Sequence, residues 1–556
     1  MPPMRNSIRR EGAPSDEPSA ASVNIGGAAA LISFFVIISR ITGFLRTWAM
    51  AFALGSTMLA SSYQVANNLP EMLYEMVIGG MLVTAFLPVY VSVKERLGEK
   101  GGNDYASNLL SITFVVLGIV ALVCTFLAPQ LIYTQSFLND QSTMGDAIFF
   151  FRFFSMQILF YGLSSIVSGL LNASRDYLWS SAAPIFNNVI VTTTFVLYAF
   201  FAQSDPEAAK LIIAIGNPLG IFVQMAIQIP ALRRNGIRIR PHIDLKDPAL
   251  IETLSIGVPA TIVMVMGLAI VSVKNAASYN AFDNGPSIIA YARLWYTLPY
   301  SFLTVPITTA MFTEIAEMFS HDDLEGFKRG IVSGTSQIIF FMVPFAMYLA
   351  VFAAPLVTLY HIGAFSSENI LQISSYLAFL ALALPLYGVS TYLQKAFSAL
   401  RRMGVYAAIM AASAVASIAF TLLFGSSALI ADPIMRMAAI ALAETVQYVV
   451  IDIACFVYLK STMGSIGIRS MLGATARSLV FGALGSAAAL GVMSVLESTV
   501  APLDGSIPHA LVVIAAGGIV ALAVTFGGAL ALKVPESAML SGLINRLLCR
   551  IGLARP

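Results

Sequence analysis

Apolar stretches of about 20 residues recur along the whole chain, and they limit its fold more than any other feature does. Each stretch is long enough to cross ~30 Å of hydrocarbon as a helix. Only 11% of the 556 residues are charged, whereas soluble domains carry ~25%. The sequence therefore predicts an all-α integral membrane protein with about 14 transmembrane helices. Their centres are expected near residues 38, 80, 119, 158, 192, 220, 265, 303, 343, 382, 414, 447, 483 and 520.

Basic residues are distributed unevenly among the predicted loops. The densest clusters are Arg233–Lys246, after the sixth stretch, and Arg546 with Arg550 in the C-terminal tail. Loops rich in Lys and Arg stay on the cytoplasmic side of a membrane. We therefore predict that both chain ends are cytoplasmic, which agrees with an even number of helices.

A motif in the first half of the chain recurs in the second half. Tyr161-Gly162, followed by Arg175, returns as Tyr387-Gly388, followed by Arg401, at an offset of 226 residues. Parallel repeats place the substrate path between their two halves. The expected segments are a disordered tail (1–23), an N-lobe of six helices (24–233), a basic loop (234–247), a C-lobe of six helices (248–460), two extra helices (461–534) and an amphipathic tail (535–556).

The first apolar stretch carries Arg40 and Arg46 on either side of Gly43. A cation near the bilayer centre costs at least ~2.5–3.5 kcal/mol, so it normally faces a bundle interior or a water-filled cavity. A glycine at this point suggests a bend in the helix. We predict that this helix hinges at Gly43, lines a polar cavity and presents cations to an anion.

Other polar residues are expected around the same cavity. Asn68, Glu71 and Glu75 are spaced to share one face of the second helix, and Lys274 and Arg293 lie on the seventh and eighth. The cations outnumber the two acids, and an anionic substrate could balance the excess. The guanidinium fork of arginine suits pyrophosphate in particular. In the alternative interpretation, the acids only neutralise cations of neighbouring helices and hold the bundle together.

Catalytic motifs are not found. The sequence has no Walker loop, no nucleophile-elbow serine and no zinc-type spacing among its Cys and His residues. We therefore expect a transporter that is not an enzyme and needs no cofactor or metal. The remaining charges in or near apolar stretches are interpreted as helix-end or packing charges: Arg152, Lys395, Arg477, Glu444 and Asp452.

The residues of the first two helices resemble those of a known family. Ser39-Arg40, Gly43-Phe44, Arg46, Asn67-Asn68-Leu69-Pro70 and Gly79-Gly80 are similar to the MurJ/MviN family, most closely to its actinobacterial branch. These proteins are lipid II flippases of the multidrug/oligosaccharidyl-lipid/polysaccharide exporter superfamily. Arg40 and Arg46 match the family's two helix-one arginines. Arg293 stands one position before the family's helix-eight arginine, and Lys274 stands where many members have Asn or Asp.

The resemblance implies a specific architecture and activity. Two six-helix lobes would form a V around a cationic cavity, and the two extra helices would make a groove for a lipid tail. The chain would flip lipid II outward across the bacterial cytoplasmic membrane by alternating access, coupled to the membrane potential or an ion. Cell-wall synthesis proteins are expected partners, and nucleic acid is not. The alternatives are a flippase for another polyprenyl-linked oligosaccharide, a multidrug antiporter of the same superfamily, and a membrane enzyme or scaffold.

Overall fold

The computed structural model describes residues 20–79, 86–499, 506–537 and 541, and these residues form helices and loops without a strand. The first helix begins at Ala20, slightly before the expected end of the N-terminal tail. The rest of that tail and most of the expected amphipathic tail lie outside the described residues. The predicted all-α class is confirmed.

The first half of the chain forms the helices α1 to α9. Their bounds are α1 (Ala20–Leu54), α2 (Met58–Tyr74), η1 (Glu75–Gly79), α3 (Leu87–Phe126), α4 (Ala128–Ser136), η3 (Gln141–Met144), α5 (Gly145–Phe154), α6 (Gln157–Ala173), α7 (Tyr177–Phe201), α8 (Pro206–Ala226) and α9 (Ile229–Arg234).

The second half forms a similar series, followed by the extra C-terminal helices. The bounds are α10 (Pro248–Ala281), α11 (Gly285–Pro299), η4 (Tyr300–Thr304), α12 (Val305–Ser320), α13 (Leu324–Val351), α14 (Ala353–Thr358), α15 (Ser367–Ala381), α16 (Leu384–Ala399), α17 (Met403–Phe424) and α18 (Pro433–Met463), then α19 (Ile468–Thr499), α20 (Ile507–Leu522), η5 (Ala523–Gly527), α21 (Gly528–Ala531) and η6 (Pro535–Ser537).

Several of these helices start at an Asp-Pro pair, which fixes their first turn. Asp205, Asp247 and Asp432 each accept a hydrogen bond from a backbone N–H of the turn that follows, at 2.9–3.0 Å. An aspartate cap satisfies an otherwise unpaired donor, and proline is well suited to the first helical position because it has no N–H to lose. The local sequence thus sets where α8, α10 and α18 begin.

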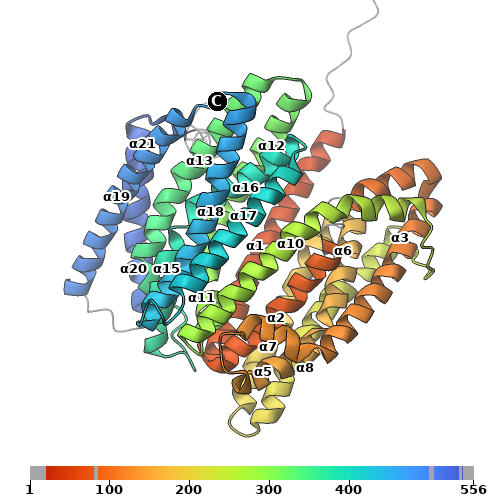
Figure 1. Cartoon of the computed structure of the whole chain (residues 1–556), viewed down its shortest axis with the longest axis horizontal. Coiled ribbons are helices and arrows are strands. Elements are labelled where there is room, and N and C mark those ends of the chain that lie inside the picture. Colours follow the sequence, from red (N-terminus) through yellow and green to blue (C-terminus); the bar gives the residue numbers. More distant parts are fainter. Residues whose placement is uncertain (1–19, 80–85, 500–505, 538–540, 542–556) are drawn as a thin grey trace, which may run out of the picture.

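The helices group into two bundles (Figure 1). In the first, α1 packs on α7, α3 on α6, and α2 on α5. In the second, α15 and α17 pack on α18, and α13 packs on α16. The extra helices α19 and α20 join this second bundle through α13. The long helix α10 contacts both bundles, with α4 on one side and α17 on the other, so it belongs to their junction.

Within the described residues, nine helices are long and apolar enough to span a membrane, or up to eleven if each of two bent helix pairs counts as one span. These eleven coincide with eleven of the expected centres. Of the other three expected centres, residue 80 lies outside the described residues, directly after η1, and residues 265 and 303 fall in α10 and in η4 between α11 and α12. The count of fourteen therefore stays a prediction.

The backbone repeats in the two halves as the sequence does. Arg175 and Arg401 both adopt positive φ, at 59° and 55°. Each sits at a helix end that closes with the same six-to-one bond, from Asp176 N to Leu171 O and from Arg402 N to Phe397 O. The π-helical turns η1 and η4 also take corresponding places, after α2 and after α11. The duplication thus extends to unusual backbone geometry.

The orientation in the membrane remains a prediction with a direct test. Cysteines introduced at Asn235 and Ser537 should resist a membrane-impermeant thiol reagent in intact cells, because both positions adjoin the densest basic clusters. The same positions should react after lysis. Labelling of either cysteine without lysis would reverse the assignment.

Candidate functional site

The two bundles are joined at the end where α1 finishes. The Ser56 and Ser287 hydroxyls lie 2.7 Å apart across the junction. Near these hydroxyls, other hydrogen bonds cross the junction with main-chain carbonyls as acceptors. Tyr291 Oη donates to Gly55 O at 2.7 Å, and Ala364 N donates to Phe52 O at 3.0 Å. We call this set of contacts, together with those below, the junction seal.

Further donors of the junction seal also use main-chain acceptors. The side-chain amides of Asn284 and Asn369 donate to Ser56 O at 3.0 and 3.3 Å. The indole N–H of Trp48 donates to Leu359 O at 3.2 Å. These bonds connect the end of α1 with segments more than 200 residues away, so they hold the two halves of the chain against each other.

Two glycines allow the backbones to meet this closely. Gly55 and Gly363 both have φ of +62°, a conformation that side chains disfavour. A Cβ on Gly55 would lie 2.3 Å from Ala364 O, and a Cβ on Gly363 would lie 2.3 Å from Phe52 O. Any larger residue at either position would therefore force the halves apart.

Two of the expected cations meet at one buried carboxylate. Lys274 Nζ lies 2.5 Å from Glu444 Oε2, and Arg293 Nη1 lies 3.1 Å from the same oxygen. The side chains of Lys274 and Glu444 are 8% and 2% exposed, whereas that of Arg293 is 44% exposed. Arg293 therefore keeps an open face while its other face is held by Glu444. We call these residues the charged triad.

Aromatic rings surround the charged triad. The Arg293 guanidinium lies 5.9 Å from the centre of the Tyr296 ring. Tyr387 stacks on Tyr296 at 5.9 Å and on Tyr300 at 4.2 Å, and Tyr448 lies 5.2 Å from Tyr387. Rings of this kind favour a nearby cation and exclude water. Where water is excluded, an unpaired cation costs more free energy, so the triad cations depend more strongly on the negative charge of Glu444.

Two of the triad residues lie on helices that contact the first bundle, Lys274 on α10 and Arg293 on α11. Lys274 is flanked on α10 by Ser272 and Asn275. Gln135 of α4 donates to Ser272, and Asn275 donates to Gln135 at 2.9 Å. Arg293 follows Tyr291 of the junction seal by two residues on α11. The triad thus ties both helices to α18 inside the second bundle.

Arg40 and Arg46 lie on α1 and are not members of the charged triad. Arg40 is exposed and Arg46 is half-buried. Neither makes an ion pair within 4.0 Å among the residues that the structure describes. Arg46 acts electrostatically on Glu71 and on the Tyr63 hydroxyl, both of the first bundle. Its guanidinium is therefore near an acid without being bound to it.

The helix α1 runs unbroken from Ala20 to Leu54, so the hinge expected at Gly43 is not present as a break in this conformation. Neighbouring contacts explain the regular helix. Asn188 of α7 donates to Ser39 O at 3.2 Å and to Thr42 Oγ1 at 3.1 Å, and a Cβ on Gly43 would make an ordinary 3.6 Å contact with Asn188. A residue with a Cβ would therefore also fit at this point.

The polar face of the second helix continues into the π turn. Asn68 and Glu71 are exposed on α2, and Glu75 begins η1 and is half-buried. Glu71 and Glu75 influence each other electrostatically, and neither has an ion-pair partner within 4.0 Å in the described parts of the chain. The expected convergence of all these residues on one cavity stays a prediction.

The assignment of Glu444 to packing was incomplete. Glu444 joins Glu71 and Glu75 as a third acid near the cations, and it is the direct partner of Lys274 and Arg293. A sequence feature could have indicated this partner. Glu444 stands in an apolar part of α18 with no basic residue within one helical turn, and an isolated acid there needs a cation from another helix.

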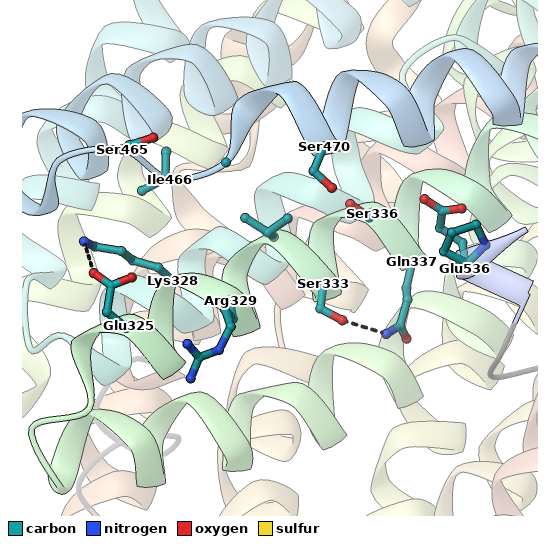
Figure 2. Close-up of a pocket in the computed structure, with 13 residues that line it drawn as sticks. Glu325, Lys328, Arg329, Ser333, Ser336, Gln337, Ser465, Ile466, Ser470 and Glu536 are labelled. Atoms are coloured by element: carbon teal, nitrogen blue, oxygen red, sulfur yellow. Dashed lines mark hydrogen bonds and ion pairs between the residues drawn. The ribbon is translucent and has the colours of Figure 1, made fainter.

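The hollows of the second bundle include an apolar one and a polar one. A small apolar pocket of about 210 Å³ lies between α11, α13 and α20, with Trp295, Phe352 and Leu522 in its walls. A larger polar hollow of about 490 Å³ lies between α13, the start of α19 and Glu536 (Figure 2). Its acids are paired, Glu325 with Lys328 at 2.7 Å and Glu536 with Arg477. None of the expected site residues lines this polar hollow.

Comparison with known proteins gives consistent matches. The family model described as lipid II flippase MurJ matches residues 50–504. A probable lipid II flippase MurJ of Rhizobium tropici is 25% identical over 498 residues, which are 87% of this chain and 88% of the relative. One of Rhizobium meliloti (strain 1021) is 27% identical over 358 residues, 63% of this chain and 66% of the relative.

Solved structures resemble the fold. A structure of lipid II flippase MurJ in an inward closed conformation superimposes with a TM-score of 0.71 at 20% identity, covering 91% of this chain and all of that one. An inward-facing multidrug resistance MATE family transporter of the MOP superfamily gives a TM-score of 0.63 at 12% identity, covering 77% of this chain and 98% of that one. The two-bundle membrane fold is thus shared.

Proposed function

The chain belongs to the lipid II flippase MurJ family, and we propose that it carries lipid II from the inner to the outer leaflet of the bacterial cytoplasmic membrane by alternating access. The observation that carries this proposal is the match of the family model to most of the chain. The junction seal supports it, because a carrier needs one end closed while the other admits substrate.

The geometry also suits an anionic lipid. Arg293 offers an open guanidinium face beside the junction, and such a fork can bind pyrophosphate oxygens in pairs. Trp295, two residues further on α11, lines the apolar pocket against α20. We propose that the polyprenyl tail lies on this side while the headgroup enters between the bundles, where Arg40, Arg46, Asn68, Glu71, Glu75 and Arg293 contribute to its site directly. The buried Lys274 contributes indirectly, by holding Glu444 behind Arg293.

The alternatives are less well supported. The cations on α1 and α11 disfavour a multidrug antiporter, whose typical substrates are cationic. A flippase for another polyprenyl-linked oligosaccharide would share the fold and the pyrophosphate of its substrate, so the identity of the transported glycan distinguishes the two functions.

We propose that the membrane potential or an ion gradient supplies the energy. One charge that crosses the potential gains ~2.3 kcal/mol per 100 mV.

Depletion of the chain in its host is expected to make lipid II accumulate in the inner leaflet, because synthesis continues while outward transport stops. Collapse of the membrane potential at constant ATP should produce the same accumulation in undepleted cells. The measurement is the amount of each lipid-linked precursor in the two leaflets. Accumulation of a different polyprenyl-linked glycan, with lipid II unchanged, would replace lipid II as the substrate.

A further inference from the structure

We propose that Glu444 is an internal counter-anion that occupies Arg293 in the empty carrier, and that the substrate pyrophosphate displaces it. This inference rests on the proposed function, because it takes a pyrophosphate lipid as the arriving anion. Glu444 acts through Arg293 and Lys274 and is therefore a positioning residue.

The arrangement of charge in the triad supports an exchange. Glu444 is almost fully buried and contacts two cations, so either one can leave without stranding it. Lys274 is also buried, at 8% exposure, and has the shorter contact. Arg293 is the partner with an accessible side chain, 44% exposed. An incoming anion can therefore bind Arg293 while Lys274 retains Glu444.

The exchange also answers an energetic problem of an empty carrier. A cation within a membrane protein is costly without a counter-charge, and a flippase must return with no substrate after each delivery. In the empty protein Glu444 supplies that counter-charge. With substrate bound, the pyrophosphate supplies it instead, so Arg293 is compensated in both halves of the cycle.

The position of the triad connects this exchange to closure. Glu444 of α18 holds α10 through Lys274 and α11 through Arg293. α10 contacts the first bundle through Gln135, and α11 contacts it at the junction seal. Release of Arg293 from Glu444 detaches α11 from α18. We infer that substrate binding at Arg293 thereby loosens the contacts of Ser287 and Tyr291 with the first bundle.

The first test measures binding of lipid II by the full-length protein in nanodiscs. The Glu444→Gln variant should bind lipid II about tenfold more tightly than wild type, because Arg293 no longer has a competing carboxylate. Glu536→Gln is the matched control, since Glu536 is also a buried acid paired with an arginine, Arg477, but lies beside α19. Its affinity for lipid II should equal that of wild type.

A second variant guards against misfolding. Glu444→Gln leaves Lys274 buried without a counter-charge, whereas Lys274→Gln combined with Glu444→Gln removes both charges and still frees Arg293. Both variants should bind more tightly. A gain in affinity cannot arise from damaged packing alone, so it distinguishes exchange from a merely structural role of Glu444.

The junction can be followed in the same samples. Cysteines placed at Phe52 and Ala364, in a chain whose Cys124, Cys455 and Cys549 are replaced by Ala, report closure by cross-linking. Lipid II should lower cross-linking in the otherwise wild-type protein, and Glu444→Gln should lower it without lipid. If wild type binds lipid II and both variants bind it equally or more weakly, the exchange is wrong. If wild type does not bind lipid II, the proposed function is wrong.

Discussion

Replacing both Arg40 and Arg46 with alanine is expected to abolish complementation in cells that depend on this chain, with the protein still present in the membrane at its normal level. Neither arginine has an ion-pair partner within 4.0 Å among the described residues, so their charge is available to a ligand. Charge-assisted contacts contribute roughly 1.5–3 kcal/mol each. Losing one should weaken binding roughly ten- to a hundredfold.

Two further variants sharpen this result. Arg46→Lys should recover only part of the activity, because an ammonium keeps the charge but lacks the planar fork. Arg402→Ala is the matched control, since Arg402 is an exposed arginine at the start of α17 and outside the site. It should complement fully. Full growth of the Arg40→Ala, Arg46→Ala double variant would remove these residues from the headgroup site.

The second large effect is expected at Gly363. The Gly363→Ala variant should fail to close the junction, because its Cβ would lie 2.3 Å from Phe52 O and 2.6 Å from the Phe52 ring. Positive φ adds a penalty of roughly 1–2 kcal/mol for a residue with a side chain. Each 1.4 kcal/mol changes a two-state ratio about tenfold, so cross-linking between positions 52 and 364 should fall by at least tenfold and transport should be largely lost.

A glycine elsewhere separates steric contact from backbone strain. Gly236 has φ of +77°, and no atom lies within 4 Å of where its Cβ would be. Gly236→Ala therefore carries the strain without the collision. It should lower thermal stability slightly and leave junction closure unchanged. Equal loss of transport in Gly236→Ala and Gly363→Ala would show that strain, and not contact between the halves, explains the effect.

The sequence predicted those features that depend on local pattern. The helical class follows from hydropathy, and the duplication follows from the repeated Tyr-Gly and Arg positions, which the structure matches in backbone conformation at Arg175 and Arg401. These results need no knowledge of which helices are neighbours.

The rest depends on contacts between distant segments. Glu444 becomes the partner of Lys274 and Arg293 only when α18 packs beside α10 and α11. The requirement for glycine at 363 comes from the approach of Phe52, more than 300 residues earlier. The hinge expected at Gly43 rested on residue type alone, whereas in this conformation Asn188 supports a regular helix there. Pairwise geometry of this kind is absent from a single sequence.

The acceptors of the junction seal are mostly peptide carbonyls, at Phe52, Gly55, Ser56 and Leu359. No amino-acid replacement deletes a carbonyl, so a random mutation at these positions leaves half of each bond in place. The acceptor side of the junction seal should therefore tolerate most amino-acid substitutions. In a selection for loss of transport, we expect inactivating missense mutations in the junction seal to concentrate at Gly55, Gly363 and the residues whose side chains donate.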